Sequence, residues 1–292
     1  MFEIVTDSAA NLKYDFAQRN NITVIPFPYF IDGEEHDCVD PEAFDAQEYY
    51  ECLRQGQIVT TSQITPQRYV ESIEPILNDG KDVLFIGLSS SVSGSVSSAM
   101  IASKQLKERY PDRRMVVVDS IGASLGEGFL PMKALELKQQ GMDIDSTADY
   151  LNEMKKHICQ IFTVDDLKHL RRTGRLSKLE TLIGSVLHIK PILKGDDKGR
   201  IVCFAKVRGR NRSIRELADR CCAFIERPEE QVIGISHACC IEDAELLKGL
   251  ISERITPKGF LTVTHEPATG SHVGPGMLAV YFLGDINFRT EA

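Results

Sequence analysis

Residues 83–100 read VLFIGLSSSVSGSVSSAM, and this stretch indicates the fold class. The run from Val83 to Leu88 is apolar, has the length of a strand and is rich in β-branched and aromatic residues. A hydroxyl-rich turn follows at residues 89–95, and apolar residues then return at helical spacing, at Val96, Ala99 and Met100. The stretch therefore predicts a buried strand, a turn and the start of a helix, which is typical of an α/β protein.

The turn in this stretch predicts an anion site. Ligands of open α/β sheets bind at the carboxyl ends of the strands. A helix N-terminus there offers unpaired N–H groups and a partial positive charge. Ser93 could donate a hydroxyl hydrogen to the anion, and Gly94 would let the backbone come close. The alternative is that these serines only cap the helix.

Length and composition set the protein class. A chain of 292 residues with 42% hydrophobic and 26% charged residues is typical of a soluble protein of one large or two ordinary domains. The net charge of −8 argues against a nucleic-acid partner. The eight cysteines form no CxxC pair, so neither a metal site nor a disulfide framework is expected. No signal peptide or membrane-spanning run is recognisable, and we expect a cytoplasmic location.

Strand and helix patterns divide the chain near residue 155. Residues 1–155 alternate between strand and helix patterns, which predicts a mainly parallel sheet covered on both faces. Residues 156–292 add a hairpin around Gly195–Gly199, which predicts a second α/β domain with a mixed sheet. Among the individual elements, we expect a helix from the capping residues Thr6-Asp7-Ser8 through Gln18, helices at 41–53 and 179–187, and a loop at 267–277.

Common catalytic motifs are absent from the sequence. It contains no GxxxxGK[ST] phosphate loop, no GxGxxG fingerprint, no HExxH and no GxSxG nucleophile elbow. The sequence therefore predicts no nucleotide cofactor, and no residue is identified as catalytic.

Three further segments could contact an anion. His272 lies in GSHVGPG, residues 270–276, where glycines allow the backbone to come close to a ligand and the imidazole can donate a hydrogen bond or a charge. Thr61-Ser62-Gln63 is a hydroxyl and amide cluster, and basic segments at 171–175 and 206–210 contrast with the acidic chain. The alternatives are an incidental histidine in a turn, a capping segment and solvated strand ends.

These segments together resemble the DegV family of bacterial fatty-acid-binding proteins, also called FakB. The resemblance runs in order over essentially the whole chain and is carried by these residues: Val5-Thr6-Asp7-Ser8, Thr61-Ser62-Gln63, Leu88-Ser89-Ser90, Ser93-Gly94, Val118-Asp119-Ser120, Gly174-Arg175-Leu176-Ser177-Lys178, Lys206-Val207-Arg208-Gly209 and His272-Val273-Gly274-Pro275-Gly276.

The resemblance implies two α/β domains with a long-chain fatty acid in a tunnel between them. It implies that Thr61 and Ser93, with Ser62 and Gly94 beside them, bind the carboxylate, and that His272 lies at the same head group. Arg208 and Arg175 would belong to the region near the head group and the partner protein. Residues around Leu182–Ile189 are candidates for the tunnel lining. This chain continues Thr61-Ser62-Gln63 with Ile64-Thr65-Pro66, so its proline comes later than in the family's TSQPS pattern.

The resemblance also implies a function without catalysis by this chain. It would present the bound acid to a separate ATP-dependent kinase, similar to dihydroxyacetone kinases, which makes an acyl-phosphate. One alternative is a lipid carrier or sensor without a kinase. Another is an acyl hydrolase with Ser93 or Thr61 as nucleophile and His272 as base.

Overall fold

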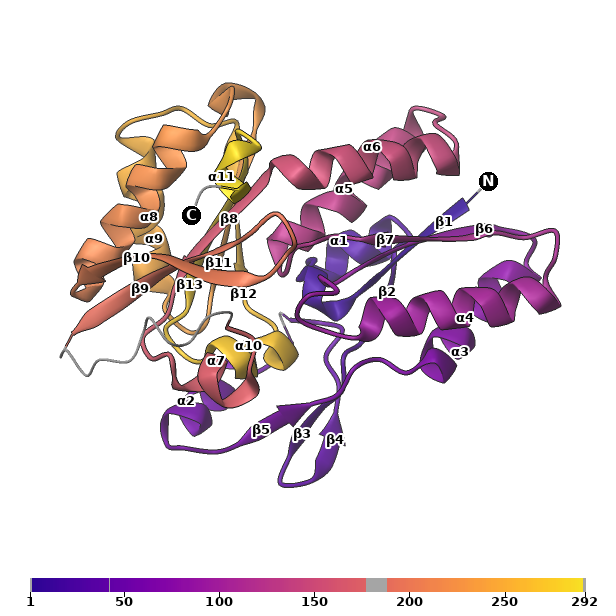
Figure 1. Cartoon of the computed structure of the whole chain (residues 1–292), viewed down its shortest axis with the longest axis horizontal. Helices are drawn as coiled ribbons and strands as arrows, with labels where there is room; N and C mark the ends of the chain where they lie inside the picture. Colours follow the sequence, from indigo (N-terminus) through magenta and orange to yellow (C-terminus); the bar gives the residue numbers. More distant parts are fainter. Residues whose placement is uncertain (1, 42, 177–187, 291–292) are drawn as a thin grey trace. The chain divides into compact units, whose positions relative to one another are not determined.

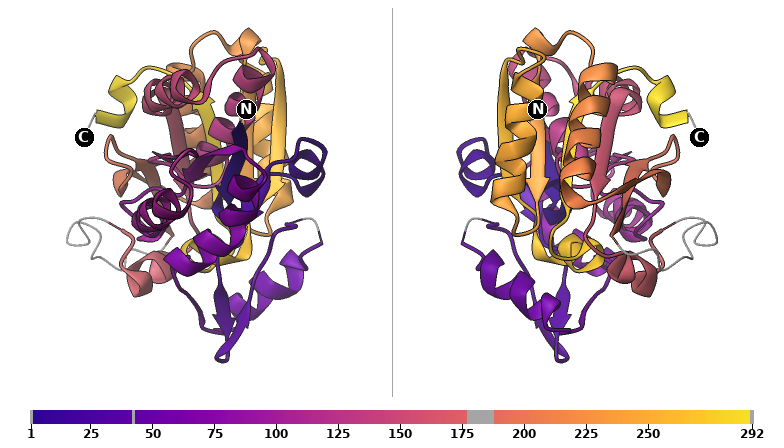
Figure 2. Two further views of the ribbon diagram at one scale, coloured as in Figure 1. Left: turned by 90° about the vertical axis from the view of Figure 1, so that its right-hand side faces the viewer. Right: turned by 90° about the vertical axis from the view of Figure 1, so that its left-hand side faces the viewer.

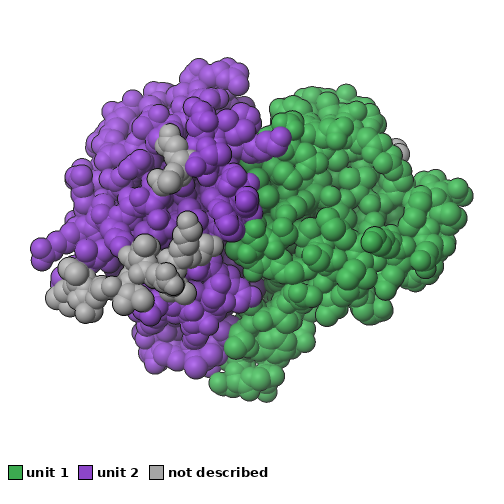
Figure 3. Space-filling view, viewed as in Figure 1, with its two compact units in different colours: residues 1–44, 60–155 green, residues 45–59, 156–292 purple. Residues whose placement is uncertain are grey.

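The structure is a computed structural model that describes residues 2–41, 43–176 and 188–290 (Figure 1). The chain divides into two compact units, coloured separately in Figure 3. The first contains residues 1–44 and 60–155, and the second contains residues 45–59 and 156–292. The helix predicted at residues 179–187 lies outside the described residues.

The first unit is built on a parallel sheet, as the alternating pattern predicts. Its strands lie in the order β2-β1-β6-β7, and each described pair of neighbours is parallel. Helices α3 and α4 lie on one side of this sheet, and α5 and α6 on the other (Figure 1). The strands are β1 (Phe2–Asp7), β2 (Thr23–Ile25), β6 (Asp82–Gly87) and β7 (Met115–Asp119). The helices are η1 (Ser8–Ala10), α1 (Tyr14–Arg19), α3 (Pro66–Asn78), α4 (Ser95–Arg109), α5 (Leu125–Gln139) and α6 (Ile144–His157).

Strand β6 and helix α4 form the unit predicted from residues 83–100. Residues 83–86 of β6 are fully buried, because the central strand of a covered sheet has no solvent-exposed face. In α4, the buried residues Val96, Ala99, Ala102 and Leu106 recur every three or four positions and pack one face of the helix inward. The sequence pattern therefore places the turn 88–94 at the carboxyl end of the sheet.

A separate three-stranded sheet has the strand order β4-β3-β5. Its strands are β3 (Tyr29–Ile31), β4 (Glu34–His36) and β5 (Val59–Thr61). The extended chain of residues 23–31 is divided between β2 and β3, which belong to different sheets. Pro26 and Pro28 lie between them, where the lack of an N–H group interrupts strand pairing.

The second unit is built on a mixed sheet, which confirms the predicted change of pattern. Its strands lie in the order β10-β9-β8-β13-β11-β12, with β11 and β12 parallel and the other described pairs antiparallel. The strands are β8 (Ile158–Thr163), β9 (Ile189–Gly195), β10 (Ile201–Arg208), β11 (Val232–His237), β12 (Gly259–Thr264) and β13 (Leu278–Leu283). The helices are α2 (Ala46–Arg54), α7 (Lys168–Thr173), α8 (Arg210–Phe224), η3 (Pro228–Glu230), α9 (Ile241–Ser252), α10 (Pro267–Val273) and α11 (Asn287–Thr290).

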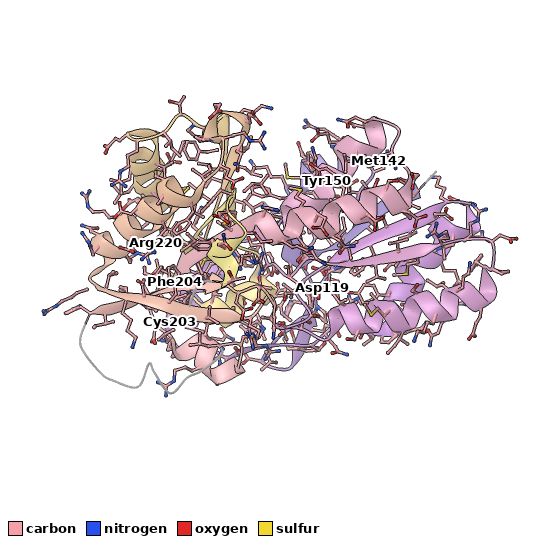
Figure 4. All side chains as sticks on the ribbon, turned by 45° about the horizontal axis from the view of Figure 1, so that its top comes forward. Asp119, Met142, Tyr150, Cys203, Phe204 and Arg220 are labelled. Atoms are coloured by element: carbon pink, nitrogen blue, oxygen red, sulfur yellow. The ribbon has the colours of Figure 1, made fainter. Side chains whose placement is uncertain are left out.

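Helices α8 and α9 lie alongside this sheet (Figure 2). Ile214, Leu217 and Leu247 from these helices pack with Ile235 and Val280 of the strands in one buried cluster. Aromatic and cationic side chains extend the packing along β10. The Arg220 guanidinium lies over the Phe204 ring, 5.3 Å from its centre, and Figure 4 shows the pair. Burial of this apolar cluster is the main force that holds the second unit together.

Two predicted helix starts are wrong. The segment after β1 is only the short 3₁₀ helix η1, because Asn11 adopts a left-handed φ of 55° and ends it, and α1 begins at Tyr14. The helix predicted from Pro41 begins at Ala46, where the Asp45 carboxylate accepts a hydrogen bond from the Glu48 N–H group at 2.9 Å.

Candidate functional site

The Ser93 turn joins β6 to α4 in the first unit, as predicted. The Ser89 carbonyl accepts hydrogen bonds from the N–H groups of Val92 and Ser93, at 3.1 and 3.2 Å. Asp119 ends β7 and is labelled in Figure 4. Its carboxylate accepts a hydrogen bond from the Ser90 N–H group at 3.2 Å. Bonds within the turn and one from the end of β7 therefore hold the turn in place.

Ser93 lies just before α4 and is bonded to its first residue. The Ser93 and Ser95 hydroxyl oxygens are 3.0 Å apart. The Ser95 N–H group also donates to the Ser93 oxygen at 3.3 Å. Gly94 occupies the N-cap position, and no side chain caps the helix there. A helix of 15 residues directs its partial positive charge toward this end, which favours an anion.

The last residue of β5, Thr61, and the segment that follows it from Ser62 lie against α4. The Ile64 N–H group donates to the Ser95 hydroxyl at 3.0 Å. The Gln63 side-chain amide donates to the Ser98 hydroxyl at 3.1 Å. Thr61 is half-buried and Ser62 is exposed. The structure therefore brings the predicted residues Thr61, Ser62, Ser93 and Gly94 together within one unit.

Gly94 was expected to let the backbone come close to an anion, and in the structure it also makes room for the Gln63 side chain. A Cβ atom at this position would lie 2.0 Å from the Gln63 side-chain oxygen. The glycine therefore allows the Gln63 amide to cross the start of α4 and reach Ser98. Its φ of −76° is ordinary, so the requirement is space rather than backbone conformation.

The later proline in this chain has a local explanation. Thr65 is the N-cap of α3 and accepts a hydrogen bond from the Arg68 N–H group at 3.2 Å. Pro66 occupies the first turn of α3, where its missing N–H group costs nothing. Ile64 is fully buried and its N–H group is bonded to Ser95, so the segment returns to the protein interior before the helix begins.

Buried polar groups gather at the ends of β1 and β6 in the same unit. The Asp7 carboxylate accepts hydrogen bonds from the Ala9 and Leu88 N–H groups, both at 3.0 Å, and so ties the two strands together. Burial raises the pKa of the Tyr69 hydroxyl, and the charges of Asp7 and Glu127 add to that rise. Tyr69 therefore stays protonated and neutral.

His272 lies in the second unit on a helix rather than in a loop. The expectation of a loop at 267–277 is wrong for its first seven residues, which form α10. The Glu266 carboxylate caps this helix by accepting hydrogen bonds from the Ala268 and Thr269 N–H groups at 2.7 and 2.6 Å. Pro267 occupies its first turn, and the helix ends at Gly274, whose φ is 78°.

Two tyrosines of α2 anchor the helix that carries His272. The Tyr49 hydroxyl donates to the Pro267 carbonyl, and the Tyr50 hydroxyl donates to the His265 carbonyl, both at 2.8 Å. A Cβ atom at Gly270 would lie 2.2 Å from the Tyr50 oxygen, so the glycine allows this close packing. Tyr49, Tyr50 and Glu266 were not identified from the sequence, because glutamate is an uncommon cap and α2 is distant in the chain.

A buried polar chain continues behind α10. The Thr269 hydroxyl donates to the Glu266 carboxylate. The His265 Nε2 atom lies 2.9 Å from the same hydroxyl oxygen, and its Nδ1 atom lies 3.3 Å from the Ser236 oxygen. Because the single Thr269 hydroxyl hydrogen goes to the carboxylate, Nε2 carries the hydrogen that bonds Thr269. Burial lowers the pKa of His265 to about 3, which keeps this imidazole neutral.

His272 itself is electrically neutral in this environment. Burial lowers its pKa to about 4, and the positive charges of Arg175 and Arg172 act in the same direction. An imidazole so placed donates a hydrogen bond without a charge at neutral pH. An anion bound next to it would offset the arginine charges and raise its pKa.

The two predicted arginines occupy different places in the second unit. Arg175 follows α7 and acts electrostatically on His272. Arg208 is the exposed last residue of β10 and pairs with Ile189 of β9. The structure thus relates Arg175 to His272, whereas Arg208 lies at a strand end. The convergence of His272 with Thr61 and Ser93 stays a prediction.

Other sequence expectations concern the tunnel and bound ions. Of the predicted tunnel residues, 182–187 lie outside the described part of the chain, and Ile189 is 40% exposed. Within residues 2–41, 43–176 and 188–290, no group of three or more His, Cys, Asp or Glu side chains could hold a metal ion. None of the helices in these ranges combines the length and hydropathy that crossing a membrane requires.

Comparison with known proteins identifies relatives over nearly the whole chain. Residues 1–285 match the model of the DegV family of uncharacterised proteins. A DegV domain-containing protein of Clostridium perfringens is 39% identical over 285 residues, covering 97% of this chain and 98% of the relative.

Solved structures share the fold. The Bacillus subtilis protein described as DegV, a fatty acid binding protein, is 31% identical with a TM-score of 0.80, over 97% of this chain and 99% of that one. A DegV family protein from Thermus thermophilus, whose structure is described by its fatty acid binding, is 24% identical with a TM-score of 0.88, over 97% and 99% of the two chains.

Proposed function

Because this chain belongs to the DegV family, we propose that it binds a long-chain fatty acid through the hydroxyl groups of Thr61 and Ser93. The observation that carries the proposal is the Ser93 turn, where a hydroxyl and the start of α4 form an anion-binding arrangement beside the Thr61 segment. The Bacillus subtilis relative, described as a fatty acid binding protein, supports the same ligand class.

The two ends of a fatty acid need different environments. Each buried CH₂ group contributes roughly 0.8 kcal/mol, so a tail of about sixteen carbons gains on the order of 10 kcal/mol before binding costs. A buried carboxylate loses its hydration and is stable only if hydrogen bonds replace it. Ser62 and Gly94 lie next to the two hydroxyl groups and complete this head-group site in the proposal.

His272 and Arg175 would contribute from the second unit. The neutral His272 imidazole would donate a hydrogen bond to the head group, and Arg175 beside it would supply a positive charge. This arrangement suits a ligand whose negative charge grows, because proton uptake by His272 can follow the increase.

Native mass spectrometry tests the ligand class directly. We expect the purified protein to carry a mass typical of a long-chain fatty acid, which organic extraction removes and added fatty acid restores. Ser93→Ala and Thr61→Val should each weaken binding of the acid, with Ser97→Ala, an exposed serine of α4, as the control. Failure of the unmodified protein to bind any fatty acid would refute the proposal.

We further propose that the bound acid is presented to a separate ATP-dependent kinase. A carboxylate oxygen would attack the γ-phosphorus of ATP, forming a P–O bond as the bond to the departing ADP breaks. The exposed Arg208 suits contact with the partner or its phosphates. The sequence itself contains no phosphate loop for ATP, and in this proposal phosphoryl transfer belongs to the other protein.

A reconstituted assay separates this role from its rivals. With a fatty acid kinase of the dihydroxyacetone kinase type and ATP, we expect ADP and an acyl-phosphate to form only when this chain is present. His272→Ala should keep the fold and reduce head-group binding or turnover. Binding without phosphorylation would favour a carrier or sensor, and ester hydrolysis by the chain alone, or an acylated mass, would favour a hydrolase.

A further inference from the structure

We propose that Ser95 is a positioning residue that makes Ser93 donate its hydroxyl hydrogen outward, to the ligand carboxylate. The inference rests on the fatty-acid function proposed above and adds a residue to its head-group site. Ser95 is the first residue of α4, and its side chain is fully buried. It stands between the two segments that carry Thr61 and Ser93.

The hydrogen bonds around Ser95 determine what its hydroxyl can do. Its oxygen accepts a hydrogen bond from the Ile64 N–H group at 3.0 Å. The same oxygen lies 3.0 Å from the Ser93 oxygen. A hydroxyl has one hydrogen to donate and two lone pairs to accept with. With one lone pair used by Ile64, Ser95 can still donate its hydrogen to Ser93.

The number of hydrogen-bond donors around the Ser93 oxygen determines the direction in which the Ser93 hydroxyl hydrogen points. The Ser93 oxygen accepts from the Ser95 N–H group at 3.3 Å. When the Ser95 hydroxyl also donates to it, both lone pairs of Ser93 are used, and its own hydrogen has to point away from Ser95. A carboxylate can only accept hydrogen bonds, so it binds to this arrangement and selects it over the reverse one.

Ser95 also sets the distance between the two binding segments. Its oxygen holds the backbone of Ile64, three residues after Thr61, while the same side chain holds Ser93. Loss of this hydroxyl leaves the buried Ile64 N–H group without its acceptor and leaves Ser93 with one donor fewer. Ser98 provides a matched comparison, because its buried hydroxyl holds Gln63 of the same segment.

The Tyr69 hydroxyl is a further neighbour of Ser95, whose side chain opposes the rise in the tyrosine pKa. Among the described residues, however, the Tyr69 oxygen has no hydrogen bond of normal geometry. We therefore assign the direction of the Ser93 hydrogen to Ser95 and expect Tyr69→Phe to leave head-group discrimination unchanged.

The test compares two ligands with the same tail, palmitic acid and cetyl alcohol, on each variant. The readout is the ratio of their affinities, because partial unfolding lowers both affinities equally and leaves the ratio unchanged. In Ser95→Ala we expect the preference for the acid to fall by about tenfold or more, the size of one hydrogen bond to a charged group. Ser98→Ala should keep the preference of the unmodified protein.

Ser95→Thr retains a hydroxyl and should restore the preference for the acid. The inference is overturned if Ser95→Ala keeps the full preference, or if Ser98→Ala or Tyr69→Phe reduces it as much. Neither of those results affects the proposed function, which fails only if the unmodified protein does not bind palmitic acid.

Discussion

The two units hold their candidate binding residues by different means. In the first unit, Ser93 and the Thr61 segment are held by short hydroxyl and backbone hydrogen bonds around Ser95, with no charged partner in those bonds. In the second unit, His272 lies on a helix capped by the buried Glu266 carboxylate, and Arg175 acts on its pKa. The comparison suggests that the first unit provides geometry, whereas the second provides groups whose charge can change.

Removing the Glu266 carboxylate should have the largest effect. Glu266→Ala leaves the Ala268 and Thr269 N–H groups and the Thr269 hydroxyl without their acceptor. We expect the free energy of unfolding of the second unit to fall by about 2–4 kcal/mol. Hydrogen exchange of peptides from the second unit measures this loss of stability. Glu266→Gln keeps one acceptor oxygen and should lose less, and equal stability of all three proteins would contradict this role.

Acid should destabilise the second unit through His265. Its pKa is about 3 in the folded protein, against an ordinary value of 6.5, so the unfolded chain binds more protons between these two values. Stability is therefore complete above pH 6.5 and falls by about 1.4 kcal/mol per pH unit for this residue as the pH drops below it.

Denaturant unfolding at several pH values checks this expectation. The quantity compared is the slope of the free energy of unfolding against pH, rather than the absolute stability. His265→Gln should give a shallower pH dependence than the unmodified protein, although it also disturbs the bonds to Thr269 and Ser236. His36→Gln, at an exposed position, is the control. An unchanged slope in His265→Gln would mean that the histidine is not kept neutral by burial.

The first unit should respond to a change of one methyl group at Gly94. In Gly94→Ala the new Cβ would displace the Gln63 side chain and break its bond to Ser98. Because a flexible side chain can move, we expect a loss of only about 1 kcal/mol of stability, the size of one hydrogen bond. Fatty-acid affinity should also fall, because the added methyl group fills the space that Gly94 leaves for the head group in the proposed site, and an unchanged affinity would show that Gly94 does not shape that site.

The smallest expected effect has the opposite sign and calibrates the others. Gly249 lies inside α9, and a Cβ atom there would meet nothing within 4 Å. Gly249→Ala should raise stability by about 0.5–1 kcal/mol, because alanine favours helix. Thermal unfolding measures the change, and ligand affinity should not move. A loss of stability would indicate that added side-chain volume is harmful even at an open position.

Local sequence patterns were sufficient to predict the helices and strands that bury one regular face. The apolar run of β6 and the spacing of Val96, Ala99 and Met100 in α4 predicted both elements, and the structure confirms them. Residues 45–59, in contrast, belong to the second unit although residues of the first unit flank them in the chain. Their partners, such as His265 and Pro267 for Tyr50 and Tyr49, are more than two hundred positions away.

The candidate site shows the same division between what the sequence predicts and what only the fold determines. The sequence motifs, together with the family resemblance they carry, made Ser93, Gly94, Thr61 and His272 candidates, since hydroxyl, glycine and imidazole groups suit an anion. Only the tertiary structure selected Ser95 from a row of similar serines and placed His272 on a capped helix. The physical reason is that the direction of a hydroxyl hydrogen and the pKa of an imidazole depend on which groups surround them in space. Those groups come from segments that are distant in the chain.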